Sequence, residues 1–124
     1  MTISFDIAQL SGELAALRAH PHARTLAVVV PVDPQRQDMT RAALAEGPPF
    51  DPRAAGLARH EVILTSDEAV FLFELAQGPR DLDAILASEE FWSVVSWWEH
   101  IATAQPRLGV VAYSWSQDTG EGTP

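Results

Sequence analysis

Two segments of the chain are apolar at nearly every position. Residues 26–30 form an unbroken aliphatic run, and residues 70–73 repeat the pattern. A strand with one solvated face alternates apolar and polar side chains, whereas a strand buried on both faces is apolar throughout. A chain of 124 residues rarely holds enough helix to cover both faces of a sheet. We therefore expect a second copy of the chain to cover part of this sheet.

Other segments carry the spacing typical of helices. In the first, apolar side chains fall on one stripe of a helix over residues 7–17: Ile7, Leu10, Leu14 and Leu17. Asp38 is expected to cap a short second helix. Ser88 is expected to cap a later helix, whose apolar face continues to residue 102 and which Pro106 ends. The chain therefore alternates helical segments with its apolar strands.

The pattern predicts four strands, over residues 25–30, 60–65, 69–75 and 108–113. With the helices, the order is an extra N-terminal helix followed by β-α-β-β-α-β. This order predicts an α+β, ferredoxin-like fold with one four-stranded antiparallel sheet. In that sheet the first and third strands are central, in agreement with their continuous apolar runs.

The length favours one domain spanning residues 1–124. Within it we expect a helical extension over residues 1–22, a ferredoxin-like core over residues 24–115 and a flexible tail over residues 116–124. The chain has no cysteine, which excludes disulfides and thiolate chemistry and is compatible with the cytoplasm, where we expect the protein to be. The start lacks the basic and apolar regions of a signal peptide, and no apolar stretch is long enough to span a membrane.

Charge and motifs exclude further classes of function. The formal net charge is −9, and the basic residues are scattered, so we expect no binding to nucleic acid. The N-terminal helix carries too few basic residues to favour a membrane surface. His20 and His22 are a close pair beside a proline, but no set of residues shows metal-ligand spacing. We therefore expect no metal and no cofactor.

The chain resembles the dimeric α+β barrel superfamily over residues 24–115. The resemblance rests on the order of the elements, on the doubly apolar strands and on the aromatic helix that contains Phe91, Trp92, Trp97 and Trp98. Residues 46–52, followed by residues 60–62, are similar to uncharacterised bacterial members. The resemblance implies a homodimer in which two sheets face each other and enclose a cavity. Its families include cofactor-independent monooxygenases, isomerases and haem-degrading enzymes, and none supplies a catalytic set that matches this chain.

The predicted hairpin offers one candidate catalytic pair. If the loop is residues 66–68, His60 lies opposite Glu74 on one face, and the carboxylate fixes the imidazole tautomer and raises its proton affinity. Such a pair can transfer a proton. A slip of one residue separates the two and places Glu61 on the face of Glu74 instead. An ordinary cross-strand ion pair at the rim of the sheet is the alternative interpretation.

Candidate ligand-binding residues are Glu61, for the alternative register, and three aromatic residues: Trp92, Tyr113 and Trp115. Contact with the rest of the fold or with a second subunit is the alternative for these rings. Our first hypothesis is a homodimer that binds a small apolar or aromatic molecule between facing sheets. A cofactor-independent monooxygenase or isomerase is the second hypothesis, and a structural or regulatory association module is the third.

Overall fold

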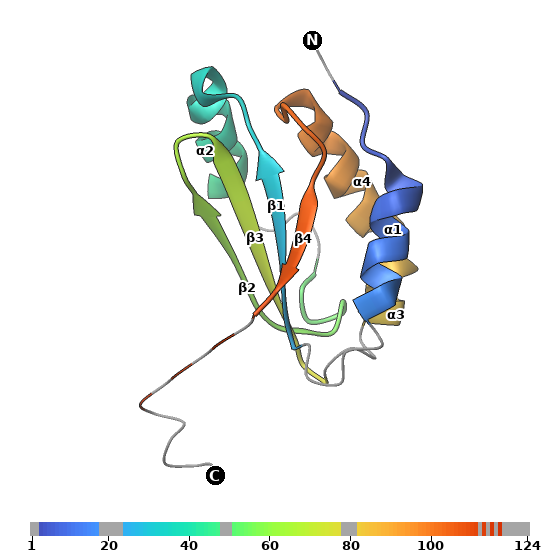
Figure 1. The fold of residues 1–124 in the computed structure, drawn as a ribbon. Helices are drawn as coiled ribbons and strands as arrows, with labels where there is room; N and C mark the ends of the chain where they lie inside the picture. The colour runs from blue at the N-terminus through green and yellow to red at the C-terminus, as the bar shows by residue number, and fades with distance from the viewer. Residues whose placement is uncertain are drawn as a thin grey trace.

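The computed structural model describes residues 3–17, 24–47, 51–77 and 82–111, together with residues 113, 115 and 117. It is an α+β fold with one four-stranded antiparallel sheet (Figure 1). The strands are β1 (Thr25–Pro31), β2 (Leu57–Leu64), β3 (Glu68–Leu75) and β4 (Arg107–Val110). The helices are α1 (Ile7–Ala16), α2 (Gln37–Ala45), α3 (Leu82–Leu86) and α4 (Glu89–Trp97), with 3₁₀ turns η2 (Pro34–Arg36) and η4 (Trp98–His100).

The two doubly apolar strands are the central ones. The strand order is β2-β3-β1-β4, and each neighbouring pair is antiparallel. This order is compatible with the ferredoxin-like arrangement and agrees with the expected positions of the central strands. β4 ends at Val110, earlier than the sequence predicted, because its last partner is Leu26 and β1 itself begins at Thr25. Of β1, Thr25 alone lies beyond that pair, so little of the strand remains for further pairing.

Of the two caps predicted from the sequence, Ser88 is confirmed and Asp38 is not, and Asp6 is a cap that was not predicted. The Asp6 side chain accepts a hydrogen bond from the Gln9 amide at the start of α1, and Ser88 accepts one from the Phe91 amide at the start of α4. Asp38 does not cap α2. That helix begins at Gln37, directly after turn η2, and Asp38 lies in its first turn. A carboxylate there still interacts favourably with the positive end of the helix.

The hydrophobic core lies on one face of the sheet. Leu26 and Phe73 belong to a cluster with side chains of α1 and α3, and Val30 and Ala69 belong to a second cluster with the N-terminal segment and η4. Phe71, which lies between Phe73 and Ala69 on the same face, packs against both clusters. Alternate residues of the central strands therefore point towards the helices, as the period of two in a strand requires.

The opposite face of the sheet has an apolar centre, which packs against neither cluster in the part of the chain that the structure describes. Its side chains are aliphatic, and Ile63 is 49% exposed. They are Ala27, Val29, Ile63, Val70 and Leu72. We call these five residues the open face. Ion pairs border it: Arg107 with Glu68 at 2.9 Å, and Arg59 with Glu61.

Three hydrogen bonds fix the N-terminal segment to the loop after α4. The Phe5 amide donates to the Glu99 carboxylate at 2.6 Å, and the Asp6 amide donates to Gln105 at 2.8 Å. The Gln105 side chain in turn donates to the Ser4 carbonyl at 2.7 Å. These contacts hold the Phe5 ring, which is 6% exposed, in the second core cluster.

Candidate ligand-binding cavity

A cavity of about 1090 Å³ lies between the sheet and α4, and its lining extends to the end of α2 on one side and to Leu10 and Leu14 of α1 on the other. Figure 1 shows α2 standing apart from α1 and α4. α2 is nine residues long, and of its side chains Leu44 packs against the second core cluster. Because α2 does not pack along the length of α4, the sheet between them is left uncovered by helix.

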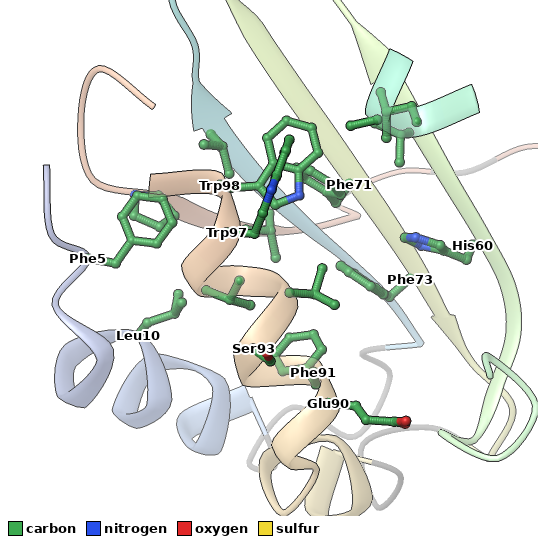
Figure 2. A pocket seen from close by; sticks show the side chains of 18 of the residues that line it. Phe5, Leu10, His60, Phe71, Phe73, Glu90, Phe91, Ser93, Trp97 and Trp98 are labelled. Atoms are coloured by element: carbon green, nitrogen blue, oxygen red, sulfur yellow. The ribbon is translucent and has the colours of Figure 1, made fainter. Parts of the chain in front are cut away.

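The walls of the cavity are largely apolar and rich in aromatic rings. Figure 2 shows Trp97, Trp98 and Phe71 at one end, and Phe91 on α4 nearer the other. The rings of Phe71 and Trp98 meet edge to face with centroids 4.9 Å apart, and those of Trp97 and Trp98 do so at 5.3 Å. Edge-to-face contacts hold rings in defined orientations. The cavity therefore presents a fixed aromatic surface.

His60 lies in the wall of this cavity, across from α4 (Figure 2). Its ring stacks on Phe73 with centroids 4.6 Å apart and an interplanar angle of 20°. Its Nδ1 lies 3.0 Å from the Leu72 carbonyl oxygen. Because a carbonyl oxygen only accepts, this hydrogen bond assigns the proton to Nδ1. The structure thus fixes both the orientation and the tautomer of the imidazole.

The structure does not bring His60 and Glu74 together. In the β2–β3 hairpin His60 pairs with Phe73, and Arg59 lies opposite Glu74. This is the second of the two registers considered, slipped by one residue from the first. The Thr65 hydroxyl explains the tighter turn, because it accepts hydrogen bonds from the amides of Asp67 and Glu68. His60 therefore faces the helices while Glu74 lies on the other face of the sheet.

Glu61 and Glu74 share that other face, as the slipped register requires. Glu61 forms its ion pair with Arg59, which also lies opposite Glu74. The arginine compensates the charge of Glu61. Although Glu61 borders the cavity through its position between His60 and Val62, its side chain belongs to the opposite face.

The three aromatic candidates lie away from the cavity wall. The Trp92 indole donates to the Leu86 carbonyl at 2.9 Å and packs against the first core cluster. Tyr113 and Trp115 follow β4 and are 81% and 73% exposed. The fold therefore places Trp92 against the core and Tyr113 and Trp115 in exposed positions after β4, and it groups none of the three with His60.

Polar groups gather at the mouth of the cavity. Glu89 and Glu90 project from the first turn of α4, Ser93 follows one turn later, and Glu46 ends α2. Figure 2 shows the Glu90 side chain extending away from the aromatic end. All four residues are exposed. An apolar interior with a polar entrance is typical of small-molecule sites.

Within the described residues, no three His, Asp or Glu side chains are grouped as a metal ion requires. The pair His20 and His22 lies outside the described residues, as do most of the positions in the expected tail. No helix in the described part of the chain is long and apolar enough to cross a membrane.

The fold defines the chain as a small α+β protein with a four-stranded antiparallel sheet. No protein-family model matches it, and no curated protein or solved structure is significantly similar to it. The cavity and the sheet are therefore the features from which a function can be inferred.

Proposed function

We propose that this protein binds a small apolar or aromatic molecule in the cavity between the sheet, α2 and α4. The observation that supports this function is an apolar hollow of about 1090 Å³ lined by aromatic rings. The cavity opens to solvent, and its apolar walls favour a ligand whose own apolar surface leaves water on binding. Ligand sites usually measure about 300–1,000 Å³, so this cavity has room for a polycyclic molecule.

This proposal keeps the ligand class expected from the sequence but changes the site. The sequence placed the ligand between the sheets of two subunits, whereas the cavity lies under the helices of one chain. We also propose that the open face is covered by a second copy of the chain, as in the dimeric α+β barrels. The two parts are independent, because the cavity and the open face lie on opposite sides of the sheet.

The charges around the open face support a second copy as its partner. The formal net charge of −9 makes two chains repel each other over most orientations. Around the open face, however, two arginines stand beside three glutamates: Arg59, Arg107, Glu61, Glu68 and Glu74. A nearly balanced rim around an apolar centre is the surface on which two copies meet with the least repulsion.

The separation of His60 from Glu74 weakens the enzyme hypothesis in its original form. General acid–base catalysis needs the two groups within hydrogen-bonding reach of one another or of the same substrate. Here His60 and Glu74 lie on opposite faces of the sheet. A binding function requires only the cavity, so it is the function that the geometry supports best.

The test is a fluorescence titration with 1-pyrenemethanol, a neutral polycyclic alcohol excited at wavelengths that tryptophan does not absorb. We expect saturable binding with one site per chain and a dissociation constant on the order of 10 µM, from the usual binding energy per ligand atom. The pyrene emission should report an apolar environment. A folded protein that binds neither this probe nor its charged analogues would contradict the proposed function.

A further inference from the structure

We propose that the natural ligand is an organic cation: an amine or quaternary ammonium group attached to an apolar or aromatic body. This inference deepens the proposed function and rests on it. It uses three features of the same cavity: the sign of the charges at its mouth, the end of α2 that faces it, and the aromatic rings within it.

The charged side chains at the mouth are all acidic. Glu46, Glu89 and Glu90 come from two elements on either side of the opening, α2 and α4. No arginine lines the cavity among the residues that the structure describes. A carboxylate or phosphate ligand would place its negative charge near these glutamates without a positive partner, which is unfavourable. An ammonium group would find opposite charges there.

The orientation of α2 adds to the same preference. Ala43, Leu44, Glu46 and Gly47 border the cavity, and all belong to or follow the last turn of α2. The C-terminal end of a helix carries a partial negative charge from its unpaired carbonyl groups. The N-terminal end of α4 also faces the mouth, and a helix carries a partial positive charge at that end. Glu89 and Glu90 lie in the first turn of α4 and offset this partial charge.

The aromatic walls supply the third contribution. A cation over the face of a tryptophan or phenylalanine ring is attracted by the π electrons, and quaternary ammonium groups are often bound in this way. Trp97 is 39% exposed and lines the cavity beside Trp98 and Phe71. Rings that are held edge to face by their neighbours keep this surface in place when a ligand enters.

Three probes with the same pyrene body separate charge from shape: 1-pyrenemethylamine, 1-pyrenemethanol and 1-pyreneacetate. At neutral pH they are positive, neutral and negative. We expect the amine to bind about tenfold more tightly than the alcohol, and the acetate to bind more weakly than both. The preference is modest because water and dissolved ions partly screen the charges at the mouth. Raising the ionic strength should reduce the preference for the amine and leave the affinity of the alcohol unchanged.

Glu90→Gln is the informative variant, and Glu13→Gln on α1 is its matched control. Both residues are exposed glutamates, but Glu13 does not line the cavity. We expect Glu90→Gln to reduce amine affinity about threefold without affecting the alcohol, and Glu13→Gln to leave both affinities unchanged. Equal effects of the two variants would mean that net charge alone attracts the amine, which would overturn the inference.

The remaining outcomes are also distinguishable. If the alcohol and the acetate bind as tightly as the amine, the cavity binds ligands without regard to charge, and only the cation inference is wrong. If none of the three probes binds, the proposed function itself is wrong, and the cation inference is overturned with it.

Discussion

Replacing Ser93 with tryptophan is expected to weaken the binding of 1-pyrenemethanol about tenfold. Ser93 is exposed on α4 and lines the cavity. An indole group at this position can turn into the hollow and occupy part of the volume that is open to the probe. Because it adds apolar contacts where there are few, the variant should be as stable as the wild type or about 1 kcal/mol more stable. Fluorescence titration and thermal unfolding measure the two effects.

Ser96→Trp is the control for this variant. Ser96 lies on the same helix and is also exposed, but it does not line the cavity. It should leave probe affinity unchanged. If both variants bind the probe as the wild type does, the binding site is elsewhere on the molecule, and the open face is then the first place to search.

Replacing Leu72 with arginine is expected to convert a homodimer into a monomer. Leu72 is central on the open face, between Glu61 of β2 and Ala27 of β1. In a dimer with facing sheets, each copy would bury one new guanidinium group, and the effective penalty is several kcal/mol per ion. In the monomer the arginine can reach Glu61 and stay hydrated. Sedimentation equilibrium should therefore show the mass of one chain for the variant and of two for the wild type.

Met39→Arg is the matched control, because Met39 is an apolar residue on α2 that is 46% exposed and lies outside the open face. The Met39→Arg variant should have the same mass in sedimentation equilibrium as the wild-type dimer. A wild-type protein that sediments as a single chain at concentrations of tens of micromolar would show that the open face is not a stable interface between copies. The cavity and its ligand would be unaffected by that result.

The sheet was the most predictable part of the fold. An unbroken aliphatic run indicates a strand that is apolar on both faces. Both faces can be buried, or, as here, one face can lie in the core while the other lies outside it. The runs that contain Val28 and Phe71 correctly indicated the two central strands. They could not indicate whether a partner binds the open face, because local sequence does not specify the partner of a surface.

The register of the hairpin could not be decided from the sequence. Two registers of β2 against β3 that differ by one residue both place apolar side chains of the two strands side by side. The reason is that β2 contains Val62, Ile63 and Leu64 in succession. The hydroxyl of Thr65 determines the tight turn through two backbone amides. A Thr-x-Asp sequence is a known signal for such turns, but its effect on the register becomes clear only when the strands are paired.

The cavity was the least predictable feature. The spacing of Phe91, Val95 and Trp98 indicated a helix face for the core, and Trp98 is indeed 6% exposed. The hollow beside it depends on how far α2 lies from α4, which is a property of tertiary packing. Trp97 lines the cavity but was not among the candidate ligand-binding residues, because nothing in the sequence indicates the hollow beside it.

The most direct test is an NMR titration of the four tryptophan indole N–H signals with 1-pyrenemethanol. Trp97 and Trp98 line the cavity, whereas Trp92 donates its indole N–H to Leu86 and Trp115 is 73% exposed. A pyrene ring in the cavity should shift the signals of Trp97 and Trp98 strongly and those of Trp92 and Trp115 little. Saturable binding that leaves Trp97 and Trp98 unshifted would contradict a ligand site between the sheet, α2 and α4.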